Sequence, residues 1–163
     1  MSDKRIALGV VGASARYGWG MRAHLPAFLA LPEYELMAVC TAHQETAEES
    51  AQHYGAPKAY SDYHDLVSDP AIEVVDVCIR APSHHSVVMA ALEAGKHVYC
   101  EKCMTRTIEE AFAVRKAVKR TGNVFQLGHQ NRQVETYEQA RRIVESGILG
   151  LVTLVEVTTN RNS

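Results

Sequence analysis

Short apolar runs alternate with helical patterns along most of the chain, and turn residues separate them. The apolar runs predict strands over residues 5–11, 35–40, 58–60, 72–79, 97–100 and 124–127. Apolar positions at helical spacing predict helices over 23–31, 45–54, 86–94, 107–121 and 137–145, with a short helix within 61–69. The sequence from Thr107 to Glu110 is typical of a capping box, and Gly122 marks the end of that helix.

The predicted strands lack the alternation of apolar and polar residues that a half-exposed strand shows. They are therefore expected to be buried on both faces, and a helix that can cross over follows nearly every one. This pattern predicts a doubly wound α/β domain with a parallel sheet over residues 1–150. Residues 151–158 form a further β-branched run with no helix after it. We interpret 151–163 as the start of a second domain, whose first strand is 151–158 and whose remainder this chain lacks.

Composition places the chain among ordinary globular proteins, with 47% hydrophobic and 22% charged residues. A net charge of −2 and the lack of any Lys/Arg cluster give no electrostatic basis for binding nucleic acid or an anionic membrane. The longest apolar runs are far shorter than the roughly 20 residues of a membrane helix. The N-terminus resembles no secretory signal. These features predict a cytoplasmic protein.

Four cysteines do not suggest a disulfide framework in a chain of this size. Cys40, Cys78 and Cys100 end apolar runs, so we expect them to be small buried hydrophobic residues. Cys100 and Cys103 form a C-x-x-C sequence, which can mean a redox dithiol or half of a zinc site. No second C-x-x-C or paired histidine motif completes a tetrahedral site. The sequence therefore predicts no metal and no obligatory disulfide.

The loops that follow the strands carry the candidate chemistry, because ligands of such sheets bind at the carboxyl ends of the strands. The loop after the first strand is rich in glycine and small residues and precedes a helix, as a dinucleotide fingerprint requires. Its candidate cofactor-binding residues are Gly12, Ala13, Ser14, Ala15, Gly18 and Trp19. Ser14 stands where the second fingerprint glycine would be. An ordinary glycine-rich turn is the alternative.

The end of the second strand bears on the choice of cofactor. Thr41, Ala42 and His43 stand where the fingerprint has an acidic residue that binds the ribose 2′-hydroxyl. Thr41 can still form a hydrogen bond, and a 2′-phosphate would meet no negative charge here. The sequence leaves NAD and NADP both open.

The stretches "GVVGAS", "ALEAGKHVYCEKC" and "GHQNR" together resemble the N-terminal domain of the Gfo/Idh/MocA oxidoreductases. The resemblance covers almost the whole chain, and its most specific element is the E-K-P motif, matched by Glu101, Lys102 and Cys103. It implies a Rossmann fold, a second α+β domain that often forms a subunit interface, and hence a homo-oligomer. It also implies a cofactor site that includes Arg80, Ala81, Pro82, His84, Glu101, Lys102 and Gln130. The loop after the fourth strand is shorter than in the family, so His84 and His85 both remain candidates.

The function that the resemblance implies is hydride transfer between NAD or NADP and a secondary alcohol of a sugar, cyclitol or similar polyol. Lys102 is the predicted catalytic residue, because an ammonium beside the hydroxyl can stabilise the alkoxide and exchange the proton. Glu101 is expected to be a positioning residue, on the nicotinamide ribose. Read alone, a Glu-Lys pair at a strand end is often only a solvated turn. The alternative function is a dinucleotide-binding sensor of the Gal80-like kind, which the long Ser14 loop with Trp19 favours and Lys102 does not.

Overall fold

The computed structural model describes residues 4–158 of the chain. Contacts within the chain define two compact units, residues 1–128 and 129–163, and we describe each by itself. The division predicted after residue 150 remains a prediction. None of the helices in residues 4–158 is both long enough and apolar enough to cross a membrane.

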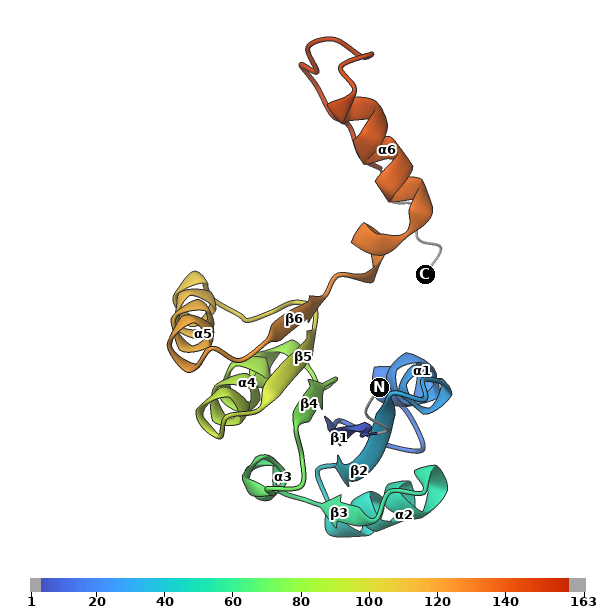
Figure 1. Cartoon of the computed structure of the whole chain (residues 1–163), viewed down its shortest axis with the longest axis vertical. Helices are drawn as coiled ribbons and strands as arrows, with labels where there is room; N and C mark the ends of the chain where they lie inside the picture. The colour runs from blue at the N-terminus through green and yellow to red at the C-terminus, as the bar shows by residue number, and fades with distance from the viewer. Residues whose placement is uncertain (1–3, 159–163) are drawn as a thin grey trace. The chain divides into compact units, whose positions relative to one another are not determined.

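The first unit is built on one six-stranded parallel sheet (Figure 1). Its strands are β1 (Ile6–Val11), β2 (Tyr34–Cys40), β3 (Lys58–Tyr60), β4 (Val74–Val77), β5 (His97–Glu101) and β6 (Phe125–Gly128). The order across the sheet is β3-β2-β1-β4-β5-β6. The chain therefore winds outward twice from the centre, and the strand order reverses between β1 and β4. This confirms the doubly wound α/β fold, and all six predicted strands of this unit are present.

Helices connect the strands. They are the π-helical turn η1 (Gly20–His24), α1 (Leu25–Ala30), α2 (Gln44–Tyr54), α3 (Tyr63–Ser68), the 3-10 turn η2 (Ala81–Ser83), α4 (His84–Glu93) and α5 (Ile108–Thr121). The capping box at the start of α5 is formed in both directions between Thr107 and Glu110. Gly55 and Gly122 end α2 and α5 in the left-handed conformation, and the end of α5 at Gly122 was predicted. The first helical segment begins three residues earlier than predicted, at the π-helical turn.

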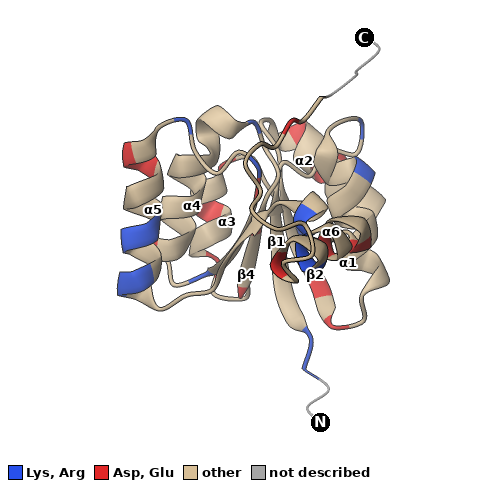
Figure 2. Ribbon diagram, turned by 90° about the horizontal axis from the view of Figure 1, so that it is seen from above, with Lys and Arg blue, Asp and Glu red and all other residues tan. Residues whose placement is uncertain are grey.

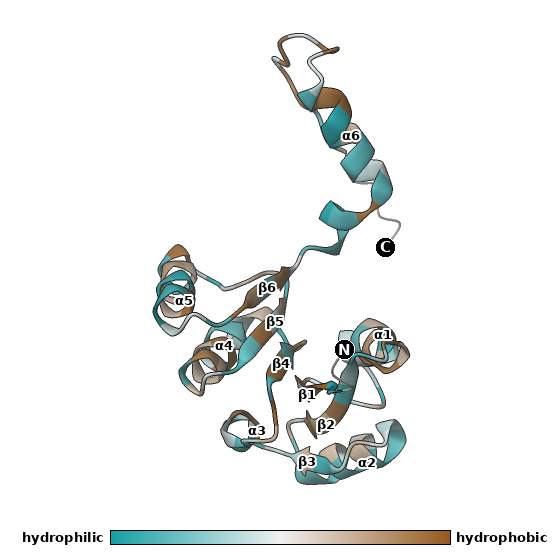
Figure 3. Cartoon of the chain, viewed as in Figure 1, coloured by the Kyte–Doolittle hydropathy of each residue, from teal (hydrophilic) through white to brown (hydrophobic). Residues whose placement is uncertain are grey.

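Each face of the sheet carries its own hydrophobic core. Helices α3, α4 and α5 cover one face, and α1 and α2 cover the other (Figure 2). The larger core joins Leu66, Val88 and Val114 to the strands, and the smaller one is built around Leu8 and Leu25. Colouring by hydropathy shows apolar strands between helices whose polar residues face outward (Figure 3). The two cores hold the strand ends, and therefore the loops that follow them, in fixed positions.

The second unit contains the 3-10 turn η3 (Gln130–Gln133) and helix α6 (Glu135–Glu145). No residue of α6 is buried. Residues 151–158 are not paired as a strand in this structure, and their place as the first strand of a second domain stays a prediction. A strand needs a neighbour that pairs with its N–H and C=O groups, and no such neighbour exists for 151–158 within the described residues. Residues 159–163 of the predicted second domain lie outside the described part.

Candidate cofactor-binding site

The candidate site is the carboxyl edge of the sheet, where the loops after β1, β2, β4 and β5 meet. The strand order reverses between β1 and β4, and sheets of this kind bind their ligands at the carboxyl edge where the order reverses. The predicted residues that are exposed in these loops are Gly18, Trp19, Ala42, His43, Arg80, Pro82 and Lys102. The parallel sheet thus brings together at one edge predicted residues that are far apart in the sequence.

Gly12 ends β1 and makes the close approach that a dinucleotide fingerprint requires. Its φ of 98° lies in the region that favours glycine. A Cβ placed there would lie 2.7 Å from the carbonyl oxygen of Cys78, at the end of β4. The backbone N–H groups of Gly12 and Ala13 both donate to the carbonyl of Cys40, at 2.9 and 3.3 Å. Only glycine therefore fits where the loop passes between β2 and β4.

The rest of this loop is tied to helix α2. The N–H of Ala15 donates to Ser50 Oγ at 3.1 Å, and the Arg16 guanidinium pairs with the Glu49 carboxylate at 2.7 Å. The N–H groups of Ser14, Tyr17 and Gly18 have no acceptor within the part of the chain that the structure describes. The loop thus combines a fixed backbone with free donors, which fits the anionic pyrophosphate of a dinucleotide.

Gly20 completes the loop and was not among the predicted site residues. It is buried, and a Cβ placed on it would lie 2.6 Å from the Gly12 carbonyl oxygen and 2.9 Å from Cys78 Sγ. It therefore serves the close packing of helix on strand that the third fingerprint glycine provides. The signal was in the sequence, because Gly20 is the last glycine before the helical pattern. It was missed because this loop has three more residues than the G-x-G-x-x-G fingerprint, whose third glycine would fall at residue 17.

Thr41, at the end of β2, uses its hydroxyl within the loop. Thr41 Oγ1 donates to the carbonyl of His43 at 3.0 Å and lies 2.6 Å from Thr46 Oγ1. This arrangement orders the first turn of α2 and leaves the Ala42 and His43 side chains exposed. The binding of a cofactor ribose by Thr41 stays a prediction.

The Glu101–Lys102 pair follows β5, and the two side chains have different environments. Lys102 is exposed, as expected, and the peptide bond between Lys102 and Cys103 is cis. Glu101 was expected to position the nicotinamide ribose, but the residue is buried, at 7% exposed, and its contact with a cofactor stays a prediction. It points to the sheet face opposite to Cys100, where it meets His24, and its second oxygen accepts the N–H of Lys102 at 3.2 Å.

A buried network of ionisable groups joins η1, β4 and β5 and was missed in the sequence. His24 Nδ1 lies 2.9 Å from both carboxylate oxygens of Asp76, and its Nε2 lies 3.1 Å from Glu101 Oε1. Asp76 is 0% exposed and His24 is 7% exposed. Burial lowers the pKa of His24, but the hydrogen bonds and charges of Asp76 and Glu101 outweigh it, so the pKa is raised. Asp76, a lone acid within an apolar strand, was the available signal, since a buried carboxylate requires a partner.

Of the two adjacent histidines, His84 is buried and His85 is half-buried. The His84 ring is 0% exposed and lies between two carbonyl oxygens, with Nδ1 2.7 Å from that of Cys103 and Nε2 3.0 Å from that of Ile79. It therefore joins the loops after β4 and β5. His85 Nε2 is buried and has no hydrogen-bond partner among the described residues. Contact of either ring with a cofactor stays a prediction.

Three of the cysteines are buried as predicted, and all four thiols are free. Burial raises the pKa of Cys40 and Cys100 to about 12.

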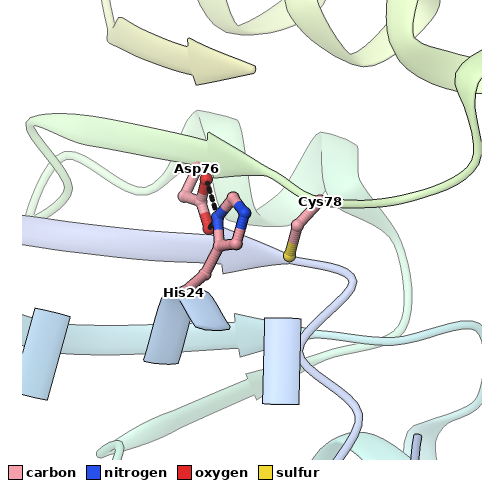
Figure 4. Close-up of side chains that lie close together, drawn as sticks. All are labelled: His24, Asp76 and Cys78. Carbon is pink, nitrogen blue, oxygen red and sulfur yellow. Dashed lines mark hydrogen bonds and ion pairs between the residues drawn. The ribbon is translucent and has the colours of Figure 1, made fainter. Parts of the chain in front are cut away.

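His24, Asp76 and Cys78 place possible metal ligands within 4.8 Å of one another (Figure 4). However, burial also raises the pKa of Cys78, and its thiol donates to the Val11 carbonyl at 3.3 Å. Both His24 nitrogens face carboxylates. The group is therefore a hydrogen-bonded network rather than a ligand set.

One predicted residue, Gln130, belongs to the second unit and is exposed there, in η3. Its role at the site stays a prediction.

Known proteins resemble this chain in sequence and in structure. Levoglucosan dehydrogenase of Pseudarthrobacter phenanthrenivorans is 31% identical over 91% of this chain, which covers 39% of that protein. The scyllo-inositol 2-dehydrogenase (NADP(+)) of Bacillus subtilis is 29% identical over 96% of this chain, which covers 42% of that protein. The scyllo-inositol dehydrogenase of Lactobacillus casei, solved with NAD(H) and scyllo-inositol, superposes with a TM-score of 0.80 and 26% identity, over 90% of this chain and 43% of that one.

These matches agree with the fold. The chain spans about 40% of the length of the relatives that it matches. A family model described as "Oxidoreductase family, NAD-binding Rossmann fold" matches residues 6–129, which include every strand of the sheet. The chain therefore belongs to the Gfo/Idh/MocA family of oxidoreductases, as the dinucleotide-binding Rossmann part of the family's architecture.

Proposed function

We propose that this chain is the cofactor-binding part of an NAD- or NADP-dependent dehydrogenase that acts on a secondary alcohol of a sugar, cyclitol or similar polyol. The observation that carries the proposal is the position of Lys102, exposed at the carboxyl edge of the sheet, with the glycine-rich loop at the same edge. Relatives named as levoglucosan and inositol dehydrogenases support the substrate class. Relatives named for NADP(+) and solved with NAD(H) keep both cofactors open.

Each part of the edge has a role in this proposal. The Gly12–Gly20 loop binds the pyrophosphate through the free N–H groups of Ser14, Tyr17 and Gly18. A bound oxidised nicotinamide would supply the acceptor for the hydride of the alcohol carbon. Lys102 would take the hydroxyl proton as the C–H bond loses its hydride, and the ammonium so formed would stabilise the negative charge that develops on the oxygen as the alcohol becomes a ketone. Remaining substrate contacts belong to residues outside this chain.

The alternative, a sensor that binds dinucleotide without chemistry, is not favoured. The relatives reported above are named as dehydrogenases, and the lysine that such a sensor does not need is present. A full-length protein that binds dinucleotide but oxidises no sugar or cyclitol would reverse this preference.

The role of the glycine-rich loop is tested with two substitutions of Ser14 that differ only in charge. The Ser14 hydroxyl accepts the N–H of Arg16 at 3.2 Å, and both Asp and Asn can keep this bond through their side-chain oxygen. Ser14→Asp places a negative charge beside the pyrophosphate, whereas Ser14→Asn does not. Titration with NAD and with NADP should show affinity at least about tenfold lower for the Asp variant than for the Asn variant. Equal affinities would remove the loop from the cofactor site.

The role of Lys102 is tested in the full-length product of the gene. Lys102→Met should lower turnover of the preferred polyol by on the order of 10²- to 10⁴-fold while the dinucleotide affinity changes little. Lys116→Met is the matched control, because Lys116 is exposed on α5, away from the carboxyl edge. Near-native turnover in Lys102→Met would exclude Lys102 from the mechanism.

A further inference from the structure

Two buried histidines flank the segment Glu101–Cys103, whose central residue is Lys102. His24 comes from η1 and lies near the Glu101 side chain, with 3.1 Å between Nε2 and Oε1. His84 begins α4 and lies near the Cys103 carbonyl, with 2.7 Å between Nδ1 and the oxygen. One histidine therefore contacts the residue before Lys102 and the other contacts the residue after it.

Each histidine is itself held by its second ring nitrogen. His24 Nδ1 lies 2.9 Å from both oxygens of Asp76, a residue of β4. His84 Nε2 lies 3.0 Å from the carbonyl of Ile79, in the loop after β4. Both rings thus link the stretch around β4 to the segment after β5. A buried ring enclosed by polar partners on both sides cannot rotate without losing a buried hydrogen bond, which makes it a rigid support.

Two buried histidines and two buried carboxylates are a costly choice of residues for a protein interior. Burying ionisable groups costs free energy that well-packed apolar side chains of similar volume would not cost. Lys102 itself is exposed and carries a long, flexible side chain, so the position of its backbone decides where its ammonium can reach. The Lys102 N–H also donates to Glu101 Oε2, the oxygen that His24 does not contact. The Glu101 carboxylate thus connects His24 to the Lys102 backbone, with one oxygen facing the ring and the other accepting the N–H.

We propose that His24 and His84 are positioning residues for Lys102: His24 acts through Nε2 on the Glu101 carboxylate, and His84 acts through Nδ1 on the Cys103 carbonyl. The consequence for catalysis rests on the proposed function, whereas the positioning itself does not. Misplacing a catalytic group by about 1 Å can cost on the order of 10²-fold in rate. The two histidines therefore contribute to turnover without touching substrate.

Asparagine and glutamine separate the two nitrogens of each ring. An Asn amide places its N–H near the position of Nδ1, and a Gln amide places its N–H near that of Nε2. His84→Asn thus keeps the bond to Cys103 and loses the one to Ile79, and His84→Gln does the reverse. His24→Gln keeps the bond to Glu101, and His24→Asn keeps the one to Asp76. If the histidines only stabilised the fold, the Asn and Gln variants at one position would not differ in their effect on the Lys102 segment.

The first readout is the backbone amide signals of the 163-residue chain in heteronuclear NMR spectra, without cofactor. The Lys102 amide should shift further in His24→Asn than in His24→Gln, because only the Gln variant holds the Glu101 carboxylate. The Met104 amide, which shares a peptide group with the Cys103 carbonyl, should shift further in His84→Gln than in His84→Asn. Equal shifts within each pair would overturn the proposal. Unfolding free energies, measured in parallel, identify any variant that fails to fold.

The second readout is turnover in the full-length protein. We expect kcat to be on the order of tenfold or more lower in His84→Gln than in His84→Asn, and in His24→Asn than in His24→Gln, with similar KM for dinucleotide within each pair. Equal kcat values within each pair would overturn the catalytic consequence. If Lys102→Met keeps its turnover, the proposed function fails, and the amide signals alone then decide whether the histidines position this segment.

Discussion

Helices α5 and α6 have similar sequence patterns and different environments. In α5 the apolar residues Val114 and Ala117 are buried against the sheet, while the charged residues face outward. In α6 the apolar residues Ile143 and Val144 are both about half exposed, and no residue of the helix is buried. A periodic pattern thus predicts that a helix has an apolar face. It does not predict that the chain contains the surface that covers this face.

The same contrast holds for the two units as a whole. Residues 1–128 contain both hydrophobic cores, whereas the apolar residues that follow α6, such as Leu151, Leu154 and Val157, are at least 80% exposed. We propose that residues 151–163 begin a second domain and that further chain or a second copy covers these residues in the complete protein. The relatives, which are more than twice as long as the stretch they share with this chain, support this proposal.

The largest difference between the units should appear when matched leucines are shortened. Leu66→Ala removes a fully buried side chain from the larger core and should lower the free energy of unfolding by about 2–5 kcal/mol. Leu154→Ala removes an 80% exposed side chain and should change it by less than about 0.5 kcal/mol. Urea unfolding followed by circular dichroism measures both. Similar losses would mean that Leu154 is covered in solution.

The second prediction concerns pH, because the buried ionisable network lies in the first unit. The pKa of His24 is raised in the folded chain: burial lowers it, but Asp76 and Glu101 outweigh that effect. The stabilisation is therefore complete below about pH 6.5, the unfolded value, and is lost as the pH rises through the folded pKa. Burial raises the pKa of Asp76, which acts in the same direction.

The free energy of unfolding should thus fall as the pH rises above about 6.5, by at most about 1.4 kcal/mol per pH unit for one proton. The control is His24→Gln, which does not titrate and should have a flatter profile. Parallel profiles of the two proteins would show that His24 is not charged in the folded chain.

The third prediction concerns self-association through the exposed segment 151–158. Its unpaired backbone groups and apolar side chains can pair with another copy, a known hazard of exposed β-prone segments. We expect the 163-residue chain to associate more than the same chain ended after Gly150. The 163-residue chain carrying Leu154→Lys should have the same monomer fraction as the chain that ends after Gly150. Sedimentation at matched concentrations measures the monomer fractions, and equal fractions would contradict the prediction.

The smallest difference should appear between two ion pairs. Arg141 and Glu138 form a largely exposed pair on α6, so Arg141→Met should change the unfolding free energy by less than about 0.5 kcal/mol. Lys58 pairs at 2.6 Å with Asp69, whose side chain is only 5% exposed. Lys58→Met should cost about 1 kcal/mol or more, because it leaves a buried carboxylate with fewer partners. Thermal unfolding of both variants tests this order, and an equal effect would contradict it.

The sequence predicts the fold of residues 1–128 well, since its strands are short, apolar and bounded by turn residues. Errors occur at the ends of elements. The strand predicted over 72–79 is only Val74–Val77, because Ile72 packs its side chain into the larger core from outside the ladder. A buried apolar residue looks the same in sequence whether or not its backbone pairs with a neighbour.

The candidate site is only partly predictable, for a physical reason. The topology of a parallel sheet places the loops after β1, β2, β4 and β5 at one edge, which a reader can deduce from the order of elements. The direction of the Glu101 side chain depends on His24, 77 residues earlier in the chain. The Asp76 side chain depends on the same ring, 52 residues away. Such partners are set by three-dimensional packing and leave only a weak local signal, a lone acid in an apolar strand.

The pairing of β1 with β4 has a consequence for how the molecule folds. Strand β1 meets β2 after one short helical segment, but Val11 and Cys78, at the ends of β1 and β4, are 67 residues apart. Closing so long a loop costs entropy before the new contacts return any free energy. The centre of the sheet is therefore expected to form late, although β1 is the first strand to leave the ribosome. A nascent chain that ends before β4 has the glycine-rich loop after β1 but lacks the strand that pairs with β1 on its other side.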